Sequence, residues 1–397
     1  MDRIELQPTD LLKKLGQFAW DAGYPLAQWR LPGSQSTFLL ISESIQKRKI
    51  DLEEVGSGFA FSPFENPQGK DTLFFPADNL YEQLPDHFTI HQQLPEDHPF
   101  WAKKPFQSTL VDDRRRDQPI SDRPDYFIQL VEKAVQSIQQ GSMKKIVLSR
   151  TMTLDDMEDF QPQEAFQKLA EAYPDAFVAW VYLPESAEMW LCATPETLVS
   201  QDDVEGIFTT MSLAGTQSGY RTDGSVVDEI DALWSQKEIE EQALVGRYII
   251  DCFKKVRIRE YEEIGPRTYR AGNLLHLKSD FTVRYQEIHF PQITTVMLDL
   301  LHPTSAVCGM PKEPATQFIR KEEAHDRSFY AGYLGPVHIQ EKTHLFVHLR
   351  TLRWKNNQIT LFAGCGVTSD SIPIKEWEET TMKCRTLGSI LFQDKLV

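Results

Sequence analysis

Short runs of strand-forming residues recur along the chain, and they constrain its fold more than any other feature. They lie at residues 146–148, 177–183, 189–192, 208–213, 281–285, 343–352 and 358–362. Such runs, rich in β-branched and aromatic residues, are typical of strands. Helical patterns separate only some of them, whereas a doubly wound nucleotide-binding fold alternates strands and helices throughout. We therefore expect an α+β layered fold with mixed or antiparallel sheets.

The chain has 397 residues, which exceeds the roughly 250–300 residues that one hydrophobic core usually supports. It contains no internal repeat, no low-complexity tract and no linker rich in proline and glycine. One large interleaved domain is therefore favoured over two separate ones. The charged stretch 110–124 is the best candidate boundary, between an N-terminal part (residues 1–120) and a main region (residues 121–397). Its basic run, residues 114–116, is flanked by aspartates and is typical of a solvated loop.

The formal net charge is −16 at pH 7. A field of this sign repels polyphosphates and anionic lipids, so we expect neither nucleic acid nor a membrane surface as a partner. The first residues show no basic segment followed by an apolar run, and no stretch of about 18 apolar residues occurs. We expect a cytoplasmic protein that acts on a small molecule as a monomer or a homodimer. An anionic substrate would need local cations or a metal.

Missing motifs exclude several common chemistries. The sequence has no GxxxxGK[ST], no GxGxxG after a strand, no HExxH and no GxSxG, so phosphate-loop, dinucleotide, zinc-protease and serine-hydrolase sites are not expected. The five cysteines are scattered, without a CxxC or a zinc-finger spacing, and we expect reduced, packed thiols.

A carboxylate lies on the apolar face of one predicted helix. Ser235 and Glu238 form an S-x-x-E capping box that fixes where this helix begins. Glu241 then falls on the apolar stripe, three and four residues before Leu244 and Val245. A buried carboxylate must meet a cation, a metal or hydrogen-bond donors, or be protonated. A salt bridge at the rim, with Lys237 or Arg247, is the simpler alternative.

The final predicted helix repeats this theme. Glu379 and Lys383 are four residues apart and share one face. By themselves they indicate an ordinary helix-stabilising pair. Together with Glu241, they would suit a Mg²⁺ held by few protein oxygens, with an anionic ligand completing the octahedron.

Two residues at strand ends could supply a base and an acid. Lys145 opens the strand IVLSR, and Glu196 follows the strand MWLCA. A strand-end lysine is usually a surface charge, but a desolvated one beside other cations can act as a base. Glu196 in an apolar setting would hold a proton to donate.

Glycine clusters occur at residues 213–216 (LAGT), 329–336 (FYAGYLGP) and 362–367 (FAGCGV). Glycine within a strand pattern often marks close backbone approach to a ligand, and tight turns are an equally good explanation. Arg350, in HLFVHLRTL, could bind a carboxylate with its forked guanidinium or form a structural ion pair.

Ten motifs make the region from Pro124 to Leu391 resemble the chorismate-utilising enzymes. In chain order they are KKIVLSR, ATPETL, SLAGT, KEIEEQ, LLHLKS, LHPTSAVCGMPK, AHDRSFYAGYLG, LFVHLRTL, LFAGCGV and EWEETTMKCRTL. That family includes isochorismate and salicylate synthases and the large subunits of anthranilate and aminodeoxychorismate synthases. The resemblance implies a large α+β fold of two packed β-sheets flanked by helices, with residues 121–397 as the chorismate-binding catalytic region.

The resemblance also implies roles for single residues. By similarity, Lys145 deprotonates the attacking water, Glu196 protonates the departing hydroxyl, and Glu241 and Glu379 hold Mg²⁺ against the ring carboxylate of chorismate. Positions similar to those that contact substrate carboxylates or line the pocket are Gly215, His276, Tyr330, Arg350, Gly364, Gly366 and Lys383. The implied reaction is a reversible allylic substitution that needs no redox cofactor.

Ala306, in SAVCG, bears on the branch of the family. The anthranilate and salicylate branches have a threonine in the similar segment GTxxG, whereas alanine at this substrate-binding position is similar to the isochorismate branch. The resemblance thus implies an isochorismate synthase, an isomerase that feeds menaquinone or siderophore biosynthesis. A salicylate, aminodeoxyisochorismate or anthranilate synthase, or an inactive ligand-binding paralogue, stays as the alternative.

Overall fold

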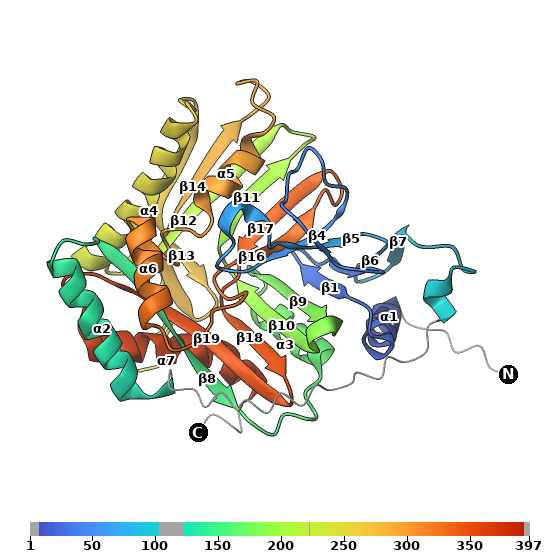
Figure 1. The fold of residues 1–397 in the computed structure, drawn as a ribbon, viewed down its shortest axis with the longest axis horizontal. Helices are drawn as coiled ribbons and strands as arrows, with labels where there is room; N and C mark the ends of the chain where they lie inside the picture. The colour runs from blue at the N-terminus through green and yellow to red at the C-terminus, as the bar shows by residue number, and fades with distance from the viewer. Residues whose placement is uncertain (1–7, 103–121, 222, 393–397) are drawn as a thin grey trace.

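The computed structural model describes residues 8–102, 122–221 and 223–392, and its strands form two antiparallel sheets flanked by helices (Figure 1). The predicted α+β fold of two packed sheets is therefore confirmed. Most of the stretch proposed as a boundary, including residues 114–116, lies outside the described residues.

The larger sheet, sheet A, consists of β1 (Leu26–Arg30), β2 (Thr37–Ile41), β6 (Asn79–Gln83), β7 (Phe88–Gln92), β8 (Lys145–Leu154), β9 (Phe177–Leu183), β10 (Glu188–Thr194), β15 (Gly309–Met310), β18 (Thr351–Lys355) and β19 (Gln358–Val367). Their order across the sheet is β15-β8-β19-β18-β10-β9-β1-β2-β6-β7.

Sheet B consists of β3 (Gln46–Lys47), β4 (Gly58–Ser62), β5 (Leu73–Pro76), β11 (Thr197–Asp202), β12 (Ile207–Ser218), β13 (Glu262–Ala271), β14 (Leu274–Arg284), β16 (Tyr333–Val337) and β17 (Lys342–Val347). Their order is β13-β14-β12-β11-β17-β16-β4-β5-β3. The N-terminal part contributes to both sheets, because β1 pairs with β9 in sheet A and β4 pairs with β16 in sheet B.

The helices of the described chain are α1 (Pro8–Ala22), α2 (Pro124–Gln139), α3 (Pro162–Ala172), α4 (Gln236–Lys255), α5 (Ile293–Leu301), α6 (Lys312–Glu322) and α7 (Pro373–Leu391). Short 3-10 turns lie at Pro67–Gly69, Pro99–Ala102, Pro184–Ser186 and Glu229–Asp231. Helices α1, α3 and α7 share a buried apolar cluster with sheet A, α2 packs on α7, and α4 and α5 contact β12 and β11 of sheet B (Figure 1).

Strand β9 shows why the sheets pack as they do. All seven of its residues are buried. Successive side chains of a strand point to opposite faces, and here Phe177, Ala179 and Val181 enter the core between the sheets, while Val178 and Trp180 enter the core that sheet A shares with the helices. A continuous apolar run is what a strand covered on both faces requires.

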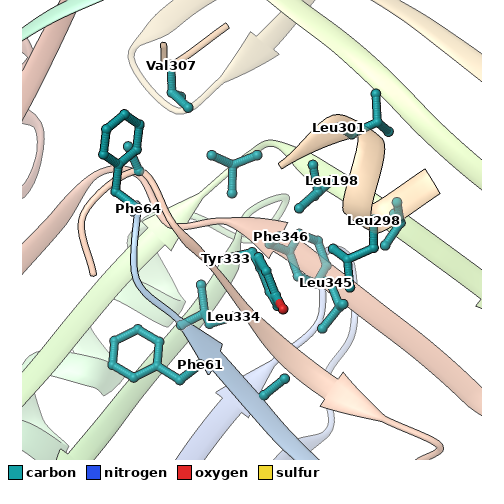
Figure 2. Close-up of a cluster of buried hydrophobic side chains, with 14 of the residues drawn as sticks. Phe61, Phe64, Leu198, Leu298, Leu301, Val307, Tyr333, Leu334, Leu345 and Phe346 are labelled. Carbon is teal, nitrogen blue, oxygen red and sulfur yellow. The ribbon is translucent and has the colours of Figure 1, made fainter. Parts of the chain in front are cut away.

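The core between the sheets is the largest apolar cluster that the structure describes. In Figure 2, Phe61, Leu334 and Phe346 of sheet B lie within this cluster. The ring of Phe346 stacks on Phe177 of sheet A with a centroid distance of 4.0 Å. Contacts of this kind join the two sheets into one packed unit.

The run 343–352 was predicted as one strand, and that prediction was wrong. The structure divides it into β17 in sheet B and β18 in sheet A. The chain changes sheets at Arg350, which has a left-handed φ of 48°. This conformation ends the extended backbone and directs the next residues to the other sheet.

Two further observations concern features expected from composition. All five cysteines lie in the described part of the chain, and each is a free, buried thiol, which confirms the expectation of packed thiols. None of the helices in residues 8–102, 122–221 and 223–392 is long and apolar enough to cross a membrane.

Replacing Phe177 by alanine should lower the free energy of unfolding by about 3–5 kcal/mol, because the ring is fully buried between the sheets. Denaturant unfolding followed by intrinsic fluorescence measures this loss. The matched control is Ile90→Ala on β7, because Ile90 is also a large apolar strand residue but is 55% exposed. The control should change stability by about 0.5 kcal/mol or less, and equal losses in the two variants would contradict this account of the core.

Candidate active site

A single cavity at the junction of the two sheets collects the residues that the sequence singled out. All twelve of them line it: Lys145, Glu196, Gly215, Glu241, His276, Ala306, Tyr330, Arg350, Gly364, Gly366, Glu379 and Lys383. They come from β8, β12, β14 and β19, from helices α4 and α7, and from the segments between elements. Residues more than 200 positions apart in the chain are thus brought to one place.

Strands β8 and β19 form one wall of the cavity. Lys145 is the first residue of β8 and is only 3% exposed, so it is not the surface charge that a strand-end lysine usually is. On the paired strand, a Cβ atom at Gly366 would collide with Glu241 Oε1 and lie 3.0 Å from Lys145 Cε. A Cβ atom at Gly364 would lie 2.8 Å from Tyr330 Oη. These two glycines therefore allow close approach of side chains, and they do not form a turn.

Glu241 is buried on α4, as its helical phase predicted. The capping box of Ser235 and Glu238 that sets this phase is also present. The nearest cation to Glu241 is Lys145, whose Nζ lies 3.9 Å from Oε1. This buried oxygen has no hydrogen-bond partner among the described residues. The alternative pairing with Lys237 is not formed, because Lys237 contacts another carboxylate.

That carboxylate is Glu376, which the sequence analysis did not single out. Its Oε1 lies 2.6 Å from Lys237 Nζ, and this ion pair joins the first turns of α4 and α7. Burial raises the pKa of Glu376, and its Oε2 has no partner among the described residues. Its spacing of three residues from Glu379 could have indicated that both share a helix face.

Lys383 and Glu379 on α7 form the predicted pair, with 2.7 Å between Nζ and Oε1. Lys383 Nζ also donates a hydrogen bond of 2.9 Å to the carbonyl oxygen of Gly364. The lysine is therefore anchored at the cavity wall. Nine further residues line the cavity that the sequence analysis included in its motifs without singling them out: Val147, Pro195, Leu213, Ala214, Thr216, Val307, Leu349, Phe362 and Ala363. Most of these are apolar and carry no chemical signal of their own in the sequence.

Glu196 lies between β10 and β11 and is 4% exposed. Its backbone is held by the hydrogen bond from Val347 N to its carbonyl oxygen, at 2.9 Å. Burial raises the pKa of its carboxyl group to about 8, although the charges of Lys145, Arg350 and Lys383 oppose this shift. Because desolvation disfavours the charged form, Glu196 is mainly protonated at neutral pH.

His276 and Arg350, which both line the cavity, form a hydrogen-bonded pair. His276 Nδ1 lies 2.9 Å from the carbonyl oxygen of Gly215, so this nitrogen carries the proton and donates. The other ring nitrogen then accepts from Arg350 NH2 at 3.1 Å. Burial, and then the charge of Arg350, lower the pKa of His276 to about 3. The neutral imidazole of His276 therefore orients the guanidinium of Arg350 without neutralising it. The positive charge of Arg350 can then pair with an anionic ligand.

Taken together, the cavity contains a neutral acid, an anchored arginine, two lysines and two carboxylates. Among the residues that the structure describes, no three His, Cys, Asp or Glu side chains converge as a metal centre by themselves. A metal here would therefore depend on oxygen atoms of a bound ligand. Such a cavity suits a small anionic substrate and proton transfer to and from it.

Comparisons with known proteins identify the family of this chain. The family model for chorismate-binding enzymes matches residues 76–392. Isochorismate synthase DhbC of Bacillus subtilis is 31% identical over 280 residues, which is 68% of each chain. Isochorismate synthase MenF of the same organism is 26% identical over 268 residues, which is 67% of this chain but only 55% of that protein.

A solved structure supports the fold. The menaquinone-specific isochorismate synthase MenF of Escherichia coli superimposes with a TM-score of 0.75, covering 97% of this chain and 100% of that one, at 18% sequence identity. At this identity the likeness concerns the fold alone. Since the family model covers most of the chain, this protein belongs to the chorismate-binding enzyme family.

Proposed function

We propose that this protein is an isochorismate synthase, which interconverts chorismate and isochorismate. The observation that carries the proposal is that two buried side chains, Lys145 and Glu196, line the same cavity. A base and an acid in one site are what the exchange of one ring hydroxyl for another requires. The names of the similar proteins DhbC and MenF support the same assignment.

In the proposed reaction, Lys145 accepts a proton from a water molecule. At the same time, the oxygen of this water bonds to the ring carbon beside the one that carries the carboxylate. The ring double bonds shift, and the hydroxyl para to that carboxylate leaves with the proton of Glu196 as a new water. One water enters and one leaves, and a proton lost to solvent by Lys145 and regained from solvent by Glu196 restores the starting state, so atoms and charge balance. The reverse reaction uses the same two groups in exchanged roles.

Positive side chains would bind the two carboxylates of chorismate. Arg350 is oriented by His276, and Lys383 is held by Gly364 and Glu379. A bidentate arginine fixes both the position and the plane of a carboxylate. Ala306 lines the same cavity and presents no hydroxyl to the substrate, which fits a reaction that stops at the exchange of hydroxyls.

We also propose that the site uses Mg²⁺, held by Glu241 and Glu379. The unpartnered, buried Oε1 of Glu241 is the feature that fits a cation. Hard oxygen donors of this kind suit Mg²⁺, which commonly takes one or two protein carboxylates and completes its shell with ligand oxygens and water. When bound, the ion would offset the negative charge of the substrate and orient its carboxylate.

The activity is tested by incubating the protein with chorismate and Mg²⁺, with and without EDTA and ammonia, and by identifying products by chromatography and mass spectrometry. We expect isochorismate in equilibrium with chorismate, loss of turnover with EDTA, and no pyruvate. Salicylate with pyruvate, or an aminated product, would contradict the proposal and assign the protein to another branch of the family. Absence of any product would indicate an inactive paralogue.

The roles of the acid and base are tested by Lys145→Ala and Glu196→Gln, each of which should reduce kcat by about 10²–10⁴-fold. Two matched controls exist. Lys144 is the exposed neighbour of Lys145, and Glu188 is a buried glutamate of β10 that does not line the cavity. Lys144→Ala and Glu188→Gln should retain near-normal turnover. Near-normal turnover in a folded Lys145 or Glu196 variant would refute its role.

A further inference from the structure

A second, much smaller cavity is also lined by Glu196. Its lining combines apolar residues, among them Leu198, Val245 and Leu301, with the hydroxyl-bearing residues Thr210, Tyr248 and Ser305. Leu198 and Leu301 of this wall are also seen in Figure 2. Glu196 borders both this cavity and the candidate active site. The cavity has a volume of about 10 Å³, which is enough for one water molecule.

The hydroxyl of Ser305 is the first sign of a ligand here. Ser305 is 3% exposed, and its Oγ has no hydrogen-bond partner among the described residues. Buried polar groups are nearly always hydrogen-bonded, to protein or to ordered water. An unpartnered buried hydroxyl in the wall of a water-sized cavity therefore indicates a bound water.

The other polar groups of the wall fit the same ligand. Thr210 Oγ1 donates its proton to the carbonyl oxygen of Leu198, and Tyr248 Oη donates to that of Leu300, both at 2.7 Å. The Thr210 oxygen can still accept a hydrogen bond, whereas the Tyr248 hydroxyl also contacts the thiol of Cys252. Among the described residues, no side chain forms a hydrogen bond with the carboxyl group of Glu196, which can act as donor or acceptor. A buried water typically makes two to four hydrogen bonds, and this wall offers that number.

We propose that this cavity binds one ordered water between Ser305 and Glu196, and that Ser305 acts through this water as a positioning residue for the acid. The inference rests on the proposed function for its catalytic meaning, but the water site stands on the cavity and the unpartnered hydroxyl. The water would hold one carboxyl oxygen of Glu196 from behind, so that the other oxygen presents its proton to the substrate. After proton transfer, the same water would donate to the carboxylate.

Other charged and titratable side chains line the two cavities that Glu196 borders. In the active-site cavity they are Lys145 on β8, Glu241 on α4, His276 on β14, Tyr330, Arg350 between β17 and β18, and Glu379 and Lys383 on α7; in the small cavity there is Tyr248 on α4. None of them is changed by a substitution at Ser305. A change in the titration of Glu196 in such a variant would therefore report on the water.

The test compares wild type with Ser305→Ala and with the control Thr294→Val. Thr294 is also fully buried with an unpartnered hydroxyl, but it lines neither cavity. Activity should fall at alkaline pH as Glu196 loses its proton, near pH 8 in wild type. We expect Ser305→Ala to lower kcat by about 10-fold at unchanged KM, a part of what a general acid contributes. Its alkaline limb should move to higher pH, because the carboxylate loses a donor. Thr294→Val should change neither.

High-resolution crystal structures complete the test. Wild type should show an ordered water within hydrogen-bond distance of Ser305 Oγ and the Glu196 carboxyl, and Ser305→Ala should lack it. A wild-type cavity without this water would overturn the inference, as would a folded Ser305→Ala variant whose pH profile matches that of an active wild type. If the wild type makes no isochorismate, the proposed function fails, and the electron density alone then decides the water site.

Discussion

Burial of charge at the junction of the two sheets is the constraint on which the rest of the site depends. Lys145, Glu196 and Glu241 are all buried and line one cavity there. Each buried charge is costly unless it is paired or neutralised. Two features offset this cost. Lysines lie beside carboxylates, and burial keeps Glu196 mainly protonated. A substrate with two carboxylates, together with a divalent cation, would complete the balance.

The architecture makes this concentration of charge possible. The chain passes from sheet B to sheet A at Arg350, so the arginine lies at the junction of the sheets. Gly364 and Gly366 on β19 leave room for the side chains of Tyr330, Lys145 and Glu241. The ion pair of Lys237 with Glu376 joins the helices that carry the metal-binding candidates. Each of these features helps to hold the charged side chains of the cavity in position.

Much of this could be predicted from local sequence. The apolar run of β9 predicted a strand, and the capping box at Ser235 fixed the phase of α4 and so placed Glu241 on its buried face. The twelve predicted residues of the cavity were assembled mainly from the resemblance to a family, since no local pattern indicates that Lys145 and Glu379 line the same cavity. Their catalytic roles stay predictions.

Other features depend on long-range packing and could not be predicted. The run 343–352 has a uniform strand pattern, and only the positions of the two sheets require the break at Arg350. The ion pair of Glu376 and the unpartnered hydroxyl of Ser305 arise from tertiary contacts. A glutamate or a serine is usually exposed, and no sequence motif around Glu376 or Ser305 indicates that these two side chains are buried.

The central claim is that water enters at one ring carbon while a hydroxyl leaves from another, with Lys145 and Glu196 moving the protons. Turnover of chorismate in water enriched in ¹⁸O, followed by mass spectrometry of the product, tests this most directly. The account predicts one ¹⁸O in each newly formed isochorismate, in the hydroxyl beside the carboxylate-bearing ring carbon. Isochorismate without ¹⁸O would mean that the hydroxyl migrates within the substrate, and would contradict the account.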